Sequence, residues 1–155
     1  MLIGLISDTH GLLRPEVHEA LAGVELILHA GDVCSDTILD ELALIAPVRA
    51  VYGNCDDPWM PGLSQEFTME LGGLRVHVSH GHEIGRPKPR QIAAAYDADV
   101  IVYGHTHIPV VERVGRTLVV NPGSAGPRQA ASPVTVARLT IDGGKAEAAL
   151  VHLLA

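Results

Sequence analysis

The sequence has few cysteines, no long apolar run and no dense basic cluster, and each shortage excludes a class of protein. Cys34 and Cys55 are the two cysteines among 155 residues, too few for a disulfide-stapled secreted domain. No apolar run approaches the roughly 20 residues of a membrane-spanning helix, so we expect no membrane association. Segment 1–8 lacks a basic leader and a small-residue cleavage site, which is typical of a first strand rather than a signal peptide. We therefore expect a cytoplasmic protein.

Basic residues are also scarce. Eighteen acidic residues stand against eleven Lys and Arg, giving a net charge of -7. Proteins that hold long nucleic acid usually carry a basic stripe, and the densest basic segment here, residues 86–90, is short. Long nucleic acid is therefore not an expected partner. A small anionic substrate is compatible with this balance, because bound divalent metals would reverse the charge locally.

The pattern of apolar runs predicts one domain over residues 1–155 with two sheets. Apolar residues make up 47% of the chain, enough for a substantial core. Turn and cap signals predict helices over 14–22, about 36–46 and 90–97, and a hairpin at Gly72-Gly73. The order is βαβαβ, then hairpin, helix and further strands. This order predicts an α+β fold, with two sheets face to face and helices on the outer faces.

Five apolar runs each end in a residue that can bind a metal ion. These residues are Asp8 with His10, then Asp32, Asn54, His80, and His105 with His107. The carboxyl ends of parallel strands share one edge of a sheet, where ligand crevices form. If segment 100–107 stays extended, His105 and His107 also share one face. Any one of these five strand-end motifs alone usually has a structural role, but all five in this order favour a metal site.

These blocks resemble the motifs of the calcineurin-like metallophosphoesterases, specifically the small YfcE-like phosphodiesterases. The matching segments are Asp8-Thr9-His10, Gly31-Asp32, Gly53-Asn54-Cys55-Asp56, His80 and Gly104-His105-Thr106-His107, within residues 4 to about 124. The resemblance implies a four-layer αββα sandwich with two divalent metals at the strand ends. It assigns one metal to Asp8, His10, Asp32 and His107. It assigns the second to Asp32, Asn54, His80 and His105, with Asp32 bridging both.

The residue types agree with that assignment on chemical grounds. Carboxylate, carboxamide and imidazole ligands suit Mn²⁺, our first choice, as well as Fe, Zn or Ni, and they need no thiolate. Two such metals activate water and clamp the oxygens of an in-line displacement at phosphorus. We therefore expect a hydrolase that uses metal-activated hydroxide on small or nucleotide-like phosphate esters.

Cys55 departs from the pattern, because much of the superfamily has a histidine there that is thought to protonate the leaving oxygen or hold the phosphate. A thiol near two cations should ionise more easily and stabilise negative charge poorly. We interpret the cysteine at position 55 as a loss of acid catalysis, so that the enzyme would favour esters with good leaving groups. A small buried apolar side chain is the other interpretation of Cys55. His82 either contacts substrate or holds a ligand in place.

We expect several other residues to support the ligand loops or the core rather than bind metal. Asp56 is expected to orient the Asn54 loop, His29 to lie in the core or behind a ligand, and His77 to face away from the metals. Segment 121–124 resembles a family loop beside the site.

Two other functions are alternatives to the enzyme. The first is a protein-binding scaffold, like the retromer subunit that shares this fold but has a degraded site. The second, a DNA-processing nuclease, is disfavoured by the short chain and acidic balance. A homo-oligomer remains open, because Trp59, Met60 and Leu63 could contact a twin subunit or form a lid.

Overall fold

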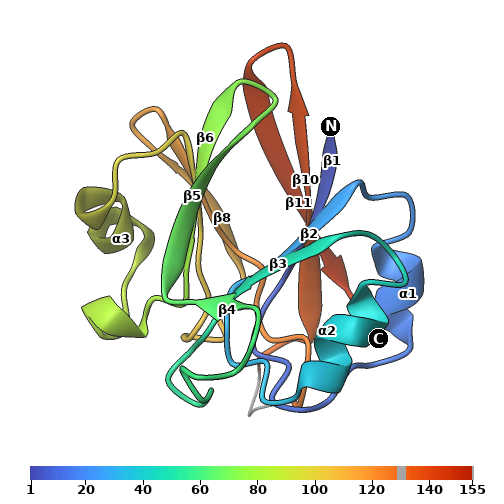
Figure 1. Cartoon of the computed structure of the whole chain (residues 1–155). Coiled ribbons are helices and arrows are strands. Elements are labelled where there is room, and N and C mark those ends of the chain that lie inside the picture. The colour runs from blue at the N-terminus through green and yellow to red at the C-terminus, as the bar shows by residue number, and fades with distance from the viewer. Residues whose placement is uncertain (129–131, 155) are drawn as a thin grey trace.

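The computed structural model describes residues 1–128 and 132–154, and its main feature is a pair of β-sheets packed face to face (Figure 1). The first sheet runs in the order β11-β10-β1-β2-β3-β4. Strands β1 to β4 are parallel, whereas β10 is antiparallel to both β1 and β11. The strands are β1 (Leu2–Ile6), β2 (Leu26–His29), β3 (Val48–Val51), β4 (Leu63–Ser64), β10 (Thr135–Asp142) and β11 (Lys145–His152).

The second sheet has five strands in the order β5-β6-β7-β9-β8. Its centre, β6-β7-β9, is parallel, and each edge strand is antiparallel to its neighbour. Its strands are β5 (Glu66–Leu71), β6 (Leu74–Ser79), β7 (Val100–Val102), β8 (Val110–Val114) and β9 (Thr117–Asn121). Both sheets are therefore mixed.

Alternation along the strands divides the apolar residues among three clusters. Ile3 and Leu5 of β1 and Val100 and Val102 of β7 belong to the cluster between the sheets. The outward-facing Ile6 packs with residues of α1 (Glu16–Ala20) and α2 (Asp36–Leu42). The outward side of β7 packs against α3 (Pro89–Ala95) on the other flank. The predicted sandwich with helices outside is confirmed.

The helices are shorter than the sequence pattern predicted. Each predicted span overlaps its helix, but α1 ends at Ala20, α2 at Leu42 and α3 at Ala95, and α3 begins at Pro89, one residue before the predicted start. Beyond α3, Tyr96 is extended, with φ −132° and ψ 140°, and its ring stacks on His77 at 3.9 Å between centroids. Tertiary packing thus ends this helix before its sequence pattern does. A one-turn 3₁₀ helix, η1 (His82–Ile84), and the short β4 were not predicted.

Among the described residues, no helix is long and apolar enough to cross a membrane.

Candidate metal centre

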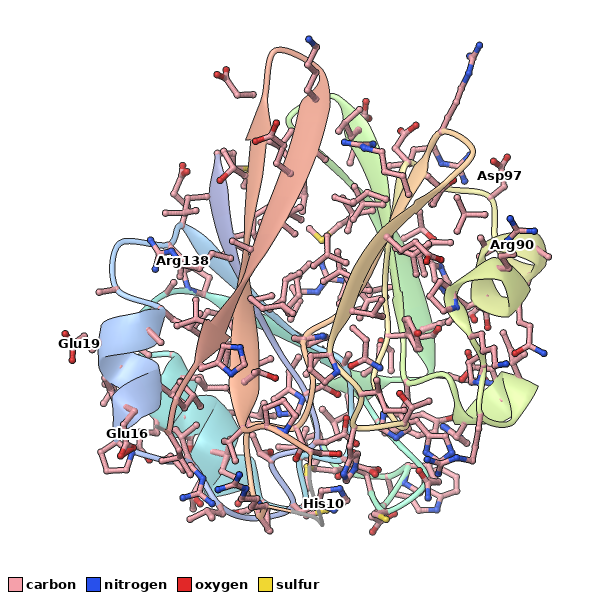
Figure 2. The ribbon with its side chains drawn as sticks, turned by 180° about the vertical axis from the view of Figure 1, so that it is seen from behind. His10, Glu16, Glu19, Arg90, Asp97 and Arg138 are labelled. Atoms are coloured by element: carbon pink, nitrogen blue, oxygen red, sulfur yellow. The ribbon has the colours of Figure 1, made fainter. Side chains whose placement is uncertain are left out.

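The loops after β1, β2, β3, β6 and β7 meet at one edge of the sandwich. Figure 2 shows His10, from the loop after β1, at this edge. Two backbone hydrogen bonds join the loops of the first sheet, from Asp8 N to Gly31 O and from His10 N to Asp32 O, both 2.9 Å. A third, from Gly104 N to His80 O at 2.9 Å, joins the loops of the second sheet. The residues that the sequence predicts at the carboxyl ends of these strands therefore lie at one edge of the structure.

Asp8 lies at the centre of this place, fully buried between three imidazoles. Its Oδ1 atom lies 3.2 Å from Nε2 of His107, 3.7 Å from Nε2 of His10 and 3.8 Å from Nε2 of His80. Oδ1 nevertheless makes no hydrogen bond to any described residue. Its partner Oδ2 accepts hydrogen bonds from the Ser7 hydroxyl (2.6 Å) and the His105 backbone N–H (3.1 Å). Three ring nitrogens and an unsatisfied carboxylate oxygen thus converge on one point.

Asp32 occupies a middle position between the two groups of histidines. Its Oδ2 atom lies 3.5 Å from Nε2 of His10 and 3.2 Å from Nε2 of His80. Its Oδ1 atom accepts a hydrogen bond from the Cys55 backbone N–H at 2.9 Å. A carboxylate with one oxygen reaching both groups has the geometry of a bridging ligand.

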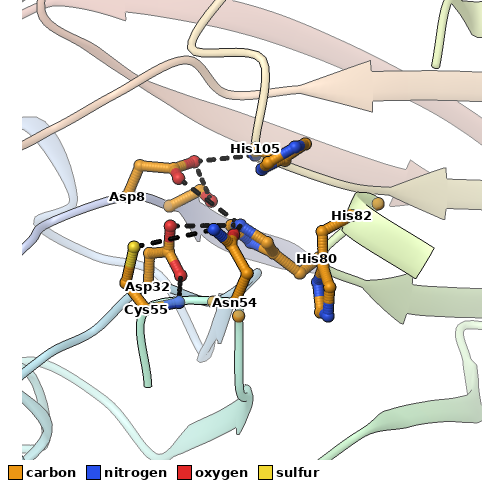
Figure 3. A network of polar contacts seen from close by, with 12 residues as sticks. Asp8, Asp32, Asn54, Cys55, His80, His82 and His105 are labelled. Carbon is orange, nitrogen blue, oxygen red and sulfur yellow. Dashed lines mark hydrogen bonds and ion pairs between the residues drawn. The ribbon is translucent and has the colours of Figure 1, made fainter. Parts of the chain in front are cut away.

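His80 shows most clearly that the site fits a cation. Its Nδ1 donates to the Ala30 carbonyl oxygen at 2.7 Å, which orients Nε2 toward the carboxylates. Nε2 lies 3.1 Å from the Asn54 Oδ1 atom as well as 3.2 Å from Asp32 Oδ2 (Figure 3). If His80 is neutral and its proton is on Nδ1, then Nε2 carries a lone pair. That lone pair would face the lone pairs of two acceptor oxygens, which is unfavourable. Either a proton or a metal ion must lie there, and the donor types suit Mn²⁺, Fe²⁺ or Zn²⁺.

The charges of the site follow the same arrangement. Burial alone would raise the pKa of Asp8, but contacts with His10, His107 and His80 outweigh it and lower that pKa. The Asp8 carboxylate in turn raises the pKa of His10. Burial opposes protonation of His80, and the neighbouring Asp32 and Asp8 raise its pKa. The carboxylates therefore stabilise positive charge on the neighbouring imidazoles.

His105 and His107 lie on opposite sides of the centre rather than on one extended face. Strand β7 ends at Val102, and both histidines have left-handed backbone angles, with φ 69° and 61°. The ring of His105 lies 5.2 Å from that of His80, whereas the ring of His107 lies 5.3 Å from that of His10. Segment 100–107 does not stay extended, so the condition for a shared face is not met, because the chain turns sharply after Gly104.

The left-handed conformation recurs at most of the candidate ligands. Among the described residues other than glycine, positive φ occurs at Asp8, His10, Asp32, Cys34, His105 and His107. Such angles cost free energy in side chains of this kind and persist where the surrounding structure enforces them, often at functional sites. Glycines permit the tight packing: a Cβ on Gly53 would collide with Asp32, and one on Gly104 would collide with Ser7.

Cys55 and His82 lie at the rim of the centre. Cys55 is exposed, so its interpretation as a small buried side chain is wrong. Its sulfur, a nitrogen of His10 and an oxygen of Asp32 all lie within 4.8 Å of one another. Burial and the charge of Asp32 raise the pKa of this thiol. His82, in η1, has its ring 5.3 Å from His80 and lies away from Asp8 and Asp32 in Figure 3.

Several residues hold the ligand loops without facing the centre. Asp56 accepts backbone hydrogen bonds from Val33 (3.2 Å), Cys34 (2.7 Å) and Gly53 (2.8 Å), so it orients the Asn54 loop as predicted. The Asn121 amide donates to Gly104 O and to Thr106 Oγ1, both at 3.0 Å. The segment beginning at Asn121 thus supports the His105–His107 turn, consistent with its resemblance to a loop beside the site.

Histidines outside the centre have structural contacts. His29 is fully buried, accepts from Gly31 N through Nδ1 and contacts the Thr9 hydroxyl through Nε2 at 3.1 Å. Burial lowers its pKa to about 4, so it is neutral and sits behind the ligand loops. His77 lies on the α3 side, stacked on Tyr96, as expected for a residue facing away from the metals.

Cys34 was the neighbour that sequence reasoning missed. Its Sγ lies 3.9 Å from Nδ1 of His10 and 3.8 Å from the Cys55 carbonyl oxygen. Cys34 reaches this position because the backbone is left-handed at Asp32 and at Cys34. No pattern of residues in the sequence predicts that turn.

Comparison with known proteins assigns the family. A model of the calcineurin-like phosphoesterase superfamily domain matches residues 1–144. A probable metallophosphoesterase of Methanothermobacter thermautotrophicus is 39% identical, over 98% of this chain and 92% of that protein. The phosphodiesterase YfcE of Escherichia coli is 29% identical, over 92% of this chain and 89% of the enzyme. The crystal structure of a single mutant of Vps29 from Entamoeba histolytica has a TM-score of 0.80 at 26% identity, covering 98% and 99% of the two chains. The chain therefore belongs to the calcineurin-like phosphoesterase superfamily.

Proposed function

We propose that the protein is a dinuclear metal-dependent phosphodiesterase acting on small or nucleotide-like phosphate esters. The observation that carries the proposal is the buried Oδ1 of Asp8, which makes no hydrogen bond to the described residues although three imidazole nitrogens lie within 3.8 Å. A buried carboxylate oxygen without a hydrogen bond is costly, and divalent cations on the convergent ligands would offset that cost. The relationship to phosphodiesterase YfcE supports the same reaction class.

The proposed ligands form two overlapping sets. Asp8, His10, Asp32 and His107 would hold one cation, and Asp32, Asn54, His80 and His105 the other. Bound cations of this kind supply an activated water and neutralise the charge of the phosphoryl oxygens. Mn²⁺ is the first choice, and Fe, Zn or Ni also suit these donors.

The remaining residues would act on the substrate. Asn54 is held against His80 at 3.1 Å, so its carboxamide position is fixed at the mouth of the centre. Cys55 exposes a thiol where a histidine would protonate the leaving oxygen, so the enzyme would favour esters with good leaving groups. His82 adjoins His80 and would contact the substrate from the η1 side.

The direct test is metal content by mass spectrometry together with hydrolysis of bis(p-nitrophenyl) phosphate with added Mn²⁺. We expect two divalent ions per chain and turnover that a chelator abolishes. A chain that takes up no divalent ion would contradict the proposal.

A protein-binding scaffold is the second candidate, favoured by the high TM-score to Vps29. Metal bound without any turnover would support the scaffold. A scaffold does not need three imidazoles close to two carboxylates, which is why we rank it second.

We further propose that residues 1–155 act as one metallophosphoesterase domain in the cytoplasm, without long nucleic acid or membrane partners. Two free cysteines fit a reducing compartment. The net charge of -7 disfavours a polyanion. Trp59, with 88% of its surface exposed, would be a contact in a homo-oligomer.

A further inference from the structure

A mainly apolar pocket lies on the α3 side of the candidate metal centre. It encloses about 230 Å³. Its apolar wall comes from the start of α3 and the segment before it, from the residue that follows β7, and from the start of β8 and the segment before it. The residues of that wall are Pro87, Pro89, Tyr103, Ile108 and Val110. Thr106 completes the lining on the side of the metal centre, and Arg86 and Lys88 lie at the rim.

The pocket shares its wall with the loops that carry the candidate ligands. Thr106 stands between His105 and His107, and its hydroxyl accepts hydrogen bonds from the Asn121 amide (3.0 Å) and the Ile108 backbone N–H (3.3 Å). Gly81 follows His80 and packs closely on the pocket residues. A Cβ there would lie 3.3 Å from Tyr103 Cδ2 and 3.6 Å from Pro87 Cγ. The pocket wall is therefore continuous in the chain with the segments that carry His80, His105 and His107.

Positive charge is concentrated at the rim of the pocket. Arg86 and Lys88 are exposed and form no ion pair within residues 1–128 and 132–154. They belong to the densest basic segment of a chain whose net charge is -7. An apolar pocket with a cationic rim fits an anionic organic group.

We propose that this pocket binds one ester substituent of the substrate, namely a ring-sized apolar group that carries a further anionic charge. A volume of about 230 Å³ holds a single ring system, below the usual range of drug-sized sites. The substrate class would then be phosphodiesters with a ring-bearing anionic substituent, as in a nucleotide. This inference rests on the proposed function, because the phosphate is taken to lie at the metal centre.

The test uses non-hydrolysable phosphonates and calorimetric binding to the Mn²⁺-loaded full chain, so that turnover is not needed. We expect phenylphosphonate to bind about 10-fold more tightly than methylphosphonate, since the ring buries apolar surface. Val110→Trp, which fills the pocket, should reduce this ratio to about 2-fold or less. Ile108→Ala removes an exposed wall residue that the fold does not need, and it should also lower the ratio.

A second pair of variants tests the rim charge. Arg86→Gln should weaken 4-carboxyphenylphosphonate about 5-fold while leaving phenylphosphonate within about 2-fold. The matched control is Arg90→Gln, the same charge change in the same segment but outside the pocket lining, which should leave both affinities unchanged.

Equal affinities for phenylphosphonate and methylphosphonate would overturn the pocket assignment while leaving the phosphodiesterase intact. So would an aryl preference that survives both Val110→Trp and Ile108→Ala. If the chain binds no Mn²⁺, or if the Mn²⁺-loaded chain binds neither phosphonate, the proposed function itself fails, and the pocket assignment fails with it.

Discussion

His107 Nε2 lies 3.2 Å from Asp8 Oδ1, although Asp8 follows a strand of one sheet and His107 follows a strand of the other. A cation at this point would join the two sheets as well as serve the chemistry. We therefore predict that Mn²⁺ stabilises the fold, by about 2–3 kcal/mol at a free concentration 100 times the dissociation constant.

Chemical denaturation with and without Mn²⁺ measures this effect. Asp8→Asn should lose the metal-dependent part of the stability. Asp97→Asn changes an exposed carboxylate far from the centre and should retain it. Equal stabilisation of wild type and Asp8→Asn would rule out Asp8 as a ligand.

Asp56 holds two ligand loops together through three backbone N–H groups. Asp56→Asn would place an amide N–H₂ against these donors, so we predict a loss of about 1–3 kcal/mol in the free energy of unfolding. Urea denaturation in the presence of a chelator measures this loss of unfolding free energy without any contribution from metal binding. The neighbouring Asp57→Asn is the matched control, because the Asp57 carboxylate accepts a single hydrogen bond from the described residues, the local one from Trp59 N. A loss no larger than that of the control would contradict the assigned role.

Cys55 occupies the position from which a histidine would assist the leaving group. A Cys55→His variant should therefore gain most on diesters with poor leaving groups and least on p-nitrophenyl esters. The dependence of kcat/KM on leaving-group pKa across a series of aryl diesters would show this as a shallower slope. Cys34→Ser, which changes a neighbouring thiol, should leave the slope unchanged. Equal gains across the series would count against lost acid catalysis.

The buried His29 predicts a specific pH dependence of stability. Its folded pKa of about 4 lies below the ordinary value of 6.5, because burial disfavours the charged ring. Between pH 4 and 6.5, His29 therefore binds a proton in the unfolded chain but not in the folded chain. The free energy of unfolding should fall as pH drops from 6.5 to 4, by on the order of 3 kcal/mol from this residue.

Denaturation in chelator at several pH values, compared with His29→Gln, tests this dependence. The variant should show a shallower decline over the same range, whereas His152→Gln, an exposed change, should follow wild type. Parallel curves for wild type and His29→Gln would assign the acid sensitivity to other groups.

The sequence predicted the architecture because its apolar runs and strand-end residues follow simple periodic rules. The end of a parallel strand is fixed by local pattern, so Asp8, Asp32, Asn54 and His80 could be placed at one edge without coordinates. The role of Asp56 also followed from its position beside Asn54.

The conformation of the ligand turns could not be predicted. Left-handed angles at His105 and His107 arise from tertiary contacts, such as the support of Thr106 by Asn121, and residue type does not encode them. The same limitation hid Cys34, whose neighbours His10 and Cys55 come from two other loops. Helix α3 ended early for a related reason, the packing of Tyr96 on His77. The division of ligands between two metals stays a prediction.

Anomalous X-ray diffraction from crystals of the Mn²⁺-loaded chain tests the central claim most directly. We predict two manganese peaks about 3.5–4 Å apart with an oxygen of Asp32 between them. A single peak, no peak, or two peaks that do not share Asp32 would contradict it.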